Sequence, residues 1–256
     1  MILAFDIGNT NIVLGCIEEG KILLKTRLET DNGKTEMEYA VTLKSILDIN
    51  KFDPKCFEGA IISSVVPPVN AAIARACELI LGITPILVDI KSNHGLIIDI
   101  DRPETLGNDL ICGAAAALEL YEPPIIIFDL GTATTISVID ENRHFAGAVI
   151  TAGLRLSQKA LFSNTAQLPA TSLEAPKSVI GKNTADSIAS GLLIGCAAMM
   201  DGMIDRIERE LGRRASVVTT GGYAPVIAKL CTRETVCNED LLLSGLWILY
   251  KRQTEN

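Results

Sequence analysis

Two stretches of this chain decide the fold: AFDIGNTNIVLG at residues 4–15 and IFDLGTATTISV at residues 127–138. They align at a constant offset, so that Asp6 matches Asp129. Each copy is an apolar strand that ends in an aspartate, a turn that contains glycine, and a second strand. A repeat of about half the chain predicts a duplicated, two-domain fold with a site between the halves. Chance similarity between two short apolar segments is the alternative.

The elements around each copy recur in a similar order. In the first half we predict strands at residues 2–6, 11–17, 21–27, 59–65 and 85–90, with helices at 34–48 and 69–81. In the second half we predict strands at 124–130, 133–140, 144–150, 215–220 and 235–237, with helices at 107–120, 153–162, 184–211 and 239–252. This order predicts an α/β fold of two domains, residues 1–113 and 114–256.

Composition limits the function. The 256 residues are 48% hydrophobic and have a formal net charge of −8, which fits a globular core and argues against nucleic-acid binding. The seven cysteines form no CxxC pair and mostly lie in apolar stretches, so we expect free, buried, reduced thiols in a cytoplasmic protein. Neither an apolar run of about 18 residues nor a signal peptide is evident, so we expect no membrane span. His94 and His144 have no partner at ligand spacing, which favours structural roles.

The two acidic turns carry the predicted chemistry. An aspartate at the mouth of a sheet suits a hydrated Mg²⁺, which prefers carboxylates, waters and substrate phosphates. Gly8 lets the backbone approach a phosphate, and backbone N–H groups with the Thr10 hydroxyl can hold phosphate oxygens. Two such turns would clamp the β- and γ-phosphates of ATP. For one turn alone, an Asx-type hairpin turn explains the sequence equally well.

A glycine pair, Gly221 and Gly222, follows a predicted strand and precedes a helix. Paired glycines there allow close approach of a flat ligand such as adenine with its ribose, and a plain strand-to-helix turn is the alternative. The chain has no GxxxxGK[ST] motif and no GxGxxG motif after a strand. A P-loop NTPase is therefore excluded, and a Rossmann dinucleotide site is unsupported.

Asp109 is the candidate general base. It lies at the predicted start of an alanine-rich helix, where a carboxylate is favoured. Phosphoryl transfer to an alcohol needs a carboxylate that accepts the hydroxyl proton and orients the nucleophile. An aspartate that only caps the helix is the alternative.

Taken in order along the chain, these motifs resemble the type III pantothenate kinases. The similarity covers essentially the whole chain and is carried by DxGNT, SSVVP (63–67), GND (107–109), FDLGTATT (128–135), AGL (152–154), TAQLP (165–169), IGKNTADSIASGLLIG (180–195) and VVTTGG (217–222). The resemblance implies the actin-like ATPase fold, with two duplicated RNase H-like domains whose mixed sheets are flanked by helices. It also implies a homodimer with pantothenate near the dimer interface. The implied reaction is ATP-dependent phosphorylation of the primary hydroxyl of pantothenate to 4'-phosphopantothenate, the first step of coenzyme A biosynthesis.

The resemblance also implies roles for individual residues. The first phosphate loop would be formed by Asp6, Ile7, Gly8, Asn9, Thr10, Asn11, Ile12 and Val13, with Asp6 holding Mg²⁺ through water. The substrate segment would be formed by Gly107, Asn108, Asp109 and Leu110. Asp129 would bind a monovalent cation, K⁺ or NH₄⁺, while Thr132 would touch ATP phosphate and Thr184 would contact pantothenate.

Two positions depart from the family pattern. The family usually has an arginine directly after its catalytic aspartate, where this chain has Leu110, and a tyrosine seven residues before the glycine of that motif, where it has Ile100. Both belong to the substrate side, and Arg102 or Arg155 could supply a cation instead. Three functions therefore stay open: a pantothenate kinase with an altered acceptor pocket, a kinase for another small hydroxyl compound, or a non-catalytic, nucleotide-binding regulator.

Overall fold

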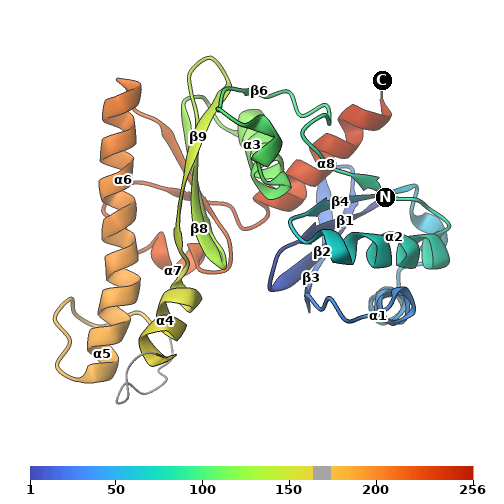
Figure 1. Cartoon of the computed structure of the whole chain (residues 1–256), viewed down its shortest axis with the longest axis horizontal. Coiled ribbons are helices and arrows are strands. Elements are labelled where there is room, and N and C mark those ends of the chain that lie inside the picture. Colours follow the sequence, from blue (N-terminus) through green and yellow to red (C-terminus); the bar gives the residue numbers. More distant parts are fainter. Residues whose placement is uncertain (164–173, 256) are drawn as a thin grey trace. The chain divides into compact units, whose positions relative to one another are not determined.

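The computed structural model describes residues 1–163 and 174–255. They form two compact units, each built on one mixed sheet with helices around it (Figure 1). The first unit comprises Met1–Gly95, Asp101–Ala116 and Leu241–Asn256, and the second comprises Leu96–Ile100 and Ala117–Asp240. The predicted division after residue 113 therefore differs from the structure in three segments. Residues 114–116 and the C-terminal helix join the first unit, and Leu96–Ile100 joins the second.

The first unit has a five-stranded sheet in the order β3-β2-β1-β4-β5. Its strands are β1 Ile2–Ile7, β2 Asn11–Glu18, β3 Lys21–Glu29, β4 Gly59–Ser64 and β5 Ile86–Leu87. Its helices are α1 Glu36–Ile49, α2 Pro67–Leu81, α8 Leu241–Thr254 and the start of α3 Asn108–Leu120, with short 3-10 turns at Pro54–Cys56 and Pro103–Thr105. Strand β1 pairs antiparallel with β2 and parallel with β4.

The two faces of this sheet have different partners. Leu3, Phe5 and Ile7 point to one face, where they form the hydrophobic core with α1 and α2. Alternate residues, including Asp6, point to the other face. Helix α8 contacts β1 and β4, and these contacts bring the C-terminus of the chain back to its N-terminal strand (Figure 1).

Two glycines allow the C-terminal helix to approach so closely. A Cβ atom at Gly59 of β4 would overlap the ring of Tyr250, and one at Gly245 would overlap the backbone of Cys112 in α3. Any larger residue at either position would push α8 away from β4 or from α3. The contact of α8 with α3, the helix that contains Asp109, therefore requires glycine at position 245.

The second unit has a six-stranded sheet in the order β11-β10-β7-β8-β9-β6. Its strands are β6 Ile97–Ile98, β7 Ile125–Leu130, β8 Ala133–Ile139, β9 His144–Ala152, β10 Ser216–Thr220 and β11 Val236–Cys237. Its helices are α4 Leu154–Ser163, α5 Thr184–Ala189, a π-helical turn Ser190–Ile194, α6 Gly195–Leu211 and α7 Ala224–Ile227, together with the end of α3.

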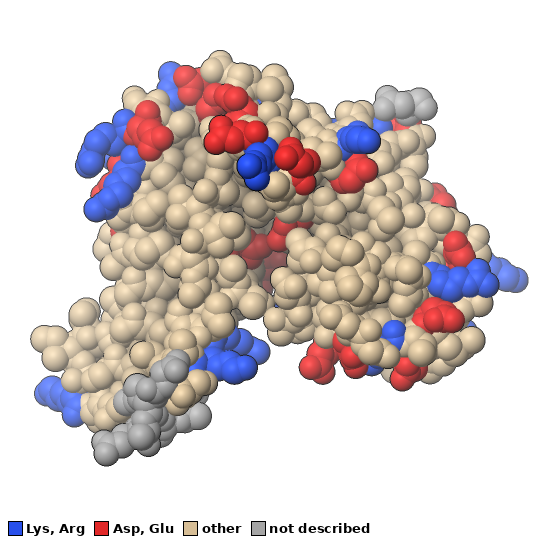
Figure 2. All heavy atoms as spheres, viewed as in Figure 1, with Lys and Arg blue, Asp and Glu red and all other residues tan. Residues whose placement is uncertain are grey.

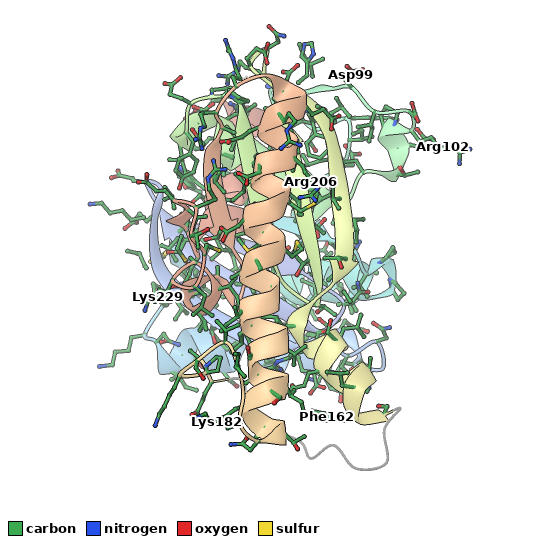
Figure 3. All side chains as sticks on the ribbon, turned by 90° about the vertical axis from the view of Figure 1, so that its left-hand side faces the viewer. Asp99, Arg102, Phe162, Lys182, Arg206 and Lys229 are labelled. Carbon is green, nitrogen blue, oxygen red and sulfur yellow. The ribbon has the colours of Figure 1, made fainter. Side chains whose placement is uncertain are left out.

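Helix α5, the π-helical turn and α6 form one long helix that lies along this sheet, with Lys182 and Arg206 near its two ends (Figure 3). By length and composition alone, Thr184–Leu211 could cross a membrane, but 39% of its most apolar window is buried. A core helix of a globular protein passes the same test, so this is weak evidence for a membrane span.

The registers of the two sheets confirm the duplication. In the first unit, Asp6 lies opposite Val13 of the following antiparallel strand and opposite Ser63 of the parallel strand β4. In the second unit, Asp129 lies opposite Thr135 and opposite Thr220 of the parallel strand β10. The two acidic turns therefore occupy the same place in two sheets of the same local topology.

The remaining sequence predictions agree with the structure in part. Strand β5 has only two residues instead of the six predicted, and β6 was not predicted. His144 is held by Asp140, and His94 is buried with its ring nitrogen against the Ile90 carbonyl, so both have structural surroundings. The cysteines form no disulfide in the described residues, but Cys56 and Cys237 are exposed, so only part of the set is buried.

Candidate active site

The first acidic turn follows β1 and is held in place by two hydrogen bonds at Gly8. The Gly8 N–H donates to the Asn11 carbonyl over 3.0 Å, and the Thr30 hydroxyl donates to the Gly8 carbonyl over 2.7 Å. Asn9 and Thr10 are exposed at the tip of the turn. Ile7 and Ile12 are buried in the core, so within the predicted phosphate loop these two residues can offer a ligand only their backbone.

Asp109 lies in the first turn of α3. Its carboxylate accepts a hydrogen bond from the Leu110 N–H over 2.9 Å. The preceding residue, Asn108, ties the start of the helix to the sheet, because its side-chain amide donates to the Ser64 carbonyl over 3.2 Å. Burial raises the pKa of Asp109, and the hydrogen bonds from the Leu110 N–H and its own N–H only partly oppose this effect. A carboxylate with a raised pKa is a better proton acceptor than an ordinary surface aspartate.

A buried thiol shows that the two carboxylates share one region of the first unit. Cys112 lies one turn after Asp109 on α3 and is fully buried. Burial raises its pKa most strongly, the nearby hydroxyl of Ser63 opposes the shift, and the negative charges of Asp6 and Asp109 raise it further. The structure therefore brings the predicted metal carboxylate and the predicted base close to the same group, although they are more than 100 residues apart in the sequence.

The second acidic turn is enclosed by glycine. Gly221 has a left-handed backbone, with φ of +89°, and a Cβ atom there would lie 2.6 Å from Asp129 Oδ1 and 2.7 Å from the Leu130 nitrogen. The glycine is thus required both by its conformation and by its contact with Asp129. Gly222 beside it is exposed, as is Thr132 in the turn itself. The glycine pair and the acidic turn, predicted separately, lie against each other in the second unit.

An arginine extends this second site. The Nε of Arg155, at the start of α4, donates to the Tyr223 hydroxyl over 3.0 Å. Tyr223 directly follows the glycine pair. The Gly153 N–H donates to the Thr132 carbonyl over 3.1 Å, which anchors the segment before Arg155 to the acidic turn. The sequence singled out Arg155 as a substitute cation but not its contact with the residue after the glycines.

The other predicted site residues occupy less defined surroundings. Thr184 is exposed at the first residue of α5, and Ile100 and Leu110 are partly buried in different units. Arg102 is exposed and its side chain extends away from the ribbon (Figure 3). The TAQLP motif at 165–169 falls outside the described residues.

The acidic residues fit some metal ions better than others. Within residues 1–163 and 174–255, no group of three or more His, Cys, Asp or Glu side chains could enclose a metal ion. This excludes a site built wholly from such ligands in that part of the chain. A single carboxylate beside an open turn, as at Asp6, fits Mg²⁺, which keeps several waters and takes its remaining ligands from substrate phosphates. On the face shown in Figure 2, acidic and basic side chains are interspersed, without a continuous basic surface among the described residues.

The two sheets, each with an acidic turn after an equivalent strand, are those of the actin-like ATPase fold. The chain belongs to the type III pantothenate kinase family: the model of that family matches residues 2–206. A type III pantothenate kinase from Bacillus cytotoxicus is 40% identical over 252 residues, covering 98% of this chain and 96% of the relative. As a member of a kinase family, the protein uses ATP.

Solved structures support the fold assignment. One is a protein from Campylobacter jejuni described as a Baf family transcriptional activator, with a TM-score of 0.59, 17% identity, and coverage of 99% of this chain and 100% of the other. Another is component A of (R)-2-hydroxyglutaryl-CoA dehydratase from Acidaminococcus fermentans, with a TM-score of 0.56, 14% identity, and coverage of 98% and 97%. At these identities the comparison concerns the fold alone.

Proposed function

We propose that this protein transfers the γ-phosphoryl group of ATP to the primary hydroxyl of pantothenate, with Asp109 as the base. The observation that carries the proposal is the link between Asp6 and Asp109 through β4: Ser63 pairs with Asp6, and the Ser64 carbonyl accepts from Asn108, the residue before Asp109. One carboxylate can serve the metal and the other the acceptor hydroxyl. The family membership supplies the identity of the acceptor.

The reaction needs little covalent chemistry from the protein. Asp109 accepts the proton as the pantothenate hydroxyl oxygen attacks the γ-phosphorus. The new bond is the phosphate ester, and the bond that breaks joins the γ-phosphorus to the bridging oxygen, so that ADP leaves. The exposed turn at Asn9 and Thr10 binds phosphate oxygens, and burial of Asp109 keeps its proton affinity high.

We assign two cations to this chemistry. Bound Mg²⁺ would neutralise the phosphates, held through water by Asp6. A monovalent cation, K⁺ or NH₄⁺, would lie beside Asp129, where Gly221 packs against the carboxylate. Thr132 would contact ATP phosphate, and the glycine pair with Tyr223 would receive the adenosine.

The acceptor side is the part of the proposal that depends on the departures from the family pattern. Leu110 and Ile100 offer no side-chain donor for the pantothenate carboxylate. Thr184, exposed at the start of α5, would contact pantothenate, and Arg102 or Arg155 would supply a cation for its carboxylate. A kinase for a different hydroxyl compound is the second candidate. It is favoured by Leu110 and Ile100, the two departures from the family pattern.

Turnover with defined acceptors tests the proposal. Purified protein with Mg²⁺, K⁺ and ATP should release ADP when pantothenate is added, and mass spectrometry should find 4'-phosphopantothenate. Asp109→Asn should abolish most of this activity, whereas Asp101→Asn, an exposed aspartate near the same segment, should not. ADP release only with another hydroxyl compound would support the second candidate. ATP binding without any turnover would support a regulator.

We also propose that the protein is a cytoplasmic homodimer that pairs through the second unit. Strand β9 is covered by β6 only at His144 and Phe145, so among the described residues its outer edge from Gly147 onward has no strand partner. Val149 and Ile150 on this strand are 38% and 69% exposed. An exposed, apolar strand edge of this kind is normally covered.

Two exposed glycines on the long helix also point to pairing through the second unit. Gly191 and Gly195 lie one turn apart on its exposed side, and a Cβ atom at either would meet nothing within 4 Å. Glycine inside a helix destabilises it, and no contact within the described chain explains these two. A second copy packed against the helix would explain them.

Sedimentation measures this directly. The native protein should sediment as a dimer at micromolar concentration, and Ile150→Asp or Gly195→Leu should produce monomer. Ile49→Asp changes a side chain that is 78% exposed on α1 of the other unit, so it should leave the mass unchanged. A native monomer would contradict the proposal.

A further inference from the structure

A buried hydroxyl in the first unit has no evident role in stability. Ser63, in β4, is 0% exposed, and its Oγ has no hydrogen-bond partner among the described residues. The Cys112 thiol, a weak hydrogen-bonding group, lies next to it. A buried hydroxyl without a good partner lowers stability, so such groups call for an explanation.

The adjacent serine is different. The Ser64 hydroxyl accepts a hydrogen bond from the Val66 N–H over 3.0 Å and so stabilises the turn into α2. Two consecutive serines therefore have opposite surroundings: one closes a turn, and the other costs folding free energy. The difference points to a role for Ser63 outside folding.

The sheet register places Ser63 beside Asp6. The two residues are direct partners in the parallel pairing of β1 with β4, and partners in a parallel pair point to the same face. Asp6 is an acceptor when ionised, and the Ser63 hydroxyl is a donor that makes no hydrogen bond among the described residues.

The second copy of the fold repeats this arrangement. Thr220 of β10 is the direct partner of Asp129, as Ser63 is of Asp6, and it is 1% exposed. Each acidic turn thus has a buried hydroxyl residue on the neighbouring parallel strand. Since the two halves differ at most other positions, repetition of this pair is an independent argument that the hydroxyl serves the aspartate.

We propose that Ser63 is a positioning residue that donates a hydrogen bond to the Asp6 carboxylate when Mg²⁺ and ATP bind. The bond would hold the carboxylate, in its ionised form, toward the waters of the metal. This inference rests on the assignment of Asp6 to the metal in the proposed function. Hydrogen bonds to charged groups are strong enough to change affinity roughly tenfold to hundredfold.

Ser63→Ala and Ser63→Cys test the proposal without relying on turnover. Alanine removes the donor and cysteine leaves only a weak one, at a site where the hydroxyl has no strong partner, so the free energy of unfolding without ligand should be unchanged or higher. Calorimetric affinity for ATP in the presence of Mg²⁺ should fall roughly tenfold or more. Affinity for ATP in excess EDTA should stay within about twofold.

Ser64→Ala is the matched control. It removes the hydrogen bond to the Val66 N–H, so it should lower stability and leave the Mg²⁺-dependent affinity unchanged. In steady-state assays Ser63→Ala should raise the KM for Mg-ATP and leave the KM for pantothenate unchanged.

The inference would be overturned if both Ser63 variants bound Mg-ATP as tightly as the native protein, or if they lost stability as Ser64→Ala does. Failure of the proposed function is a separate result, because nucleotide affinity is measured without pantothenate. A native protein that binds Mg-ATP but does not phosphorylate pantothenate would refute the acceptor and leave the Ser63 comparison intact.

Discussion

Replacement of Asp109 by asparagine separates a catalytic role from a structural one. Asparagine keeps a side-chain oxygen that can accept the hydrogen bond from the Leu110 N–H, so the local contact at the start of α3 is preserved. It cannot accept a proton at neutral pH. Loss of a general base lowers turnover about 10²–10⁴-fold, which corresponds to roughly 2.7–5.4 kcal/mol of activation free energy.

The same substitution should not destabilise the fold. Burial raises the pKa of Asp109 above its ordinary value, so the ionised carboxylate costs stability in the folded protein. The contribution of the Asp109 carboxyl group to the free energy of unfolding is most favourable below its ordinary pKa. This contribution is lost as the pH rises through the raised pKa. Asparagine does not ionise. The stability of Asp109→Asn relative to the native protein should therefore increase across that interval, by about 1.4 kcal/mol for each unit of pKa shift, and then stay constant.

Two measurements decide the matter. Coupled ADP release at saturating ATP and pantothenate gives the turnover number, and urea unfolding between about pH 4 and 8 gives the relative stability. The two proteins keep every other titratable group, so pH effects on stability that are common to both cancel in the comparison. A variant that keeps the native rate but loses stability at every pH would show that Asp109 only caps the helix.

Three further predictions follow from the site. Rates should be higher in K⁺ or NH₄⁺ than in Na⁺ after thorough buffer exchange, and equal rates would refute the cation site at Asp129. Gly221→Ala should lower the free energy of unfolding by about 1–3 kcal/mol, because the new Cβ meets Asp129 in a left-handed conformation; urea unfolding checks this. The double variant Ile100→Tyr, Leu110→Arg should lower the KM for pantothenate about tenfold, since it restores a charge-assisted contact. A native enzyme that the double change does not improve would show that another residue already binds the carboxylate.

The sequence predicts this fold best where the pattern is local. The strands around Asp6 and Asp129 follow from short apolar runs that end in turn residues, and their positions are confirmed within a few residues. The elements against which α8 packs could not be predicted from such local patterns. Its partners Gly59 and Cys112 lie far away in the sequence, and nothing local distinguishes their contacts from those of any amphipathic helix.

The candidate site shows a similar limit. Asp109 and the glycine pair stood out because their residue types suit phosphoryl transfer. Ser63 did not, because a serine in an apolar strand has many explanations until the register places it beside Asp6. Only three-dimensional pairing shows that its hydroxyl lacks a partner while that of Ser64 has one.

The two copies of the acidic turn share a scaffold but have acquired different surroundings, and this difference assigns their tasks. The turn after β1 lies in a region with a second carboxylate, Asp109, whose burial raises its proton affinity. The turn after β7 is instead closed by Gly221, which packs against Asp129. A base is useful only next to the acceptor hydroxyl, whereas glycine is useful where a ligand or a neighbouring backbone must come close. Duplication thus explains why both halves contain an aspartate. In the proposed function, the later divergence leaves the base in the first half and the close approach of the adenosine in the second.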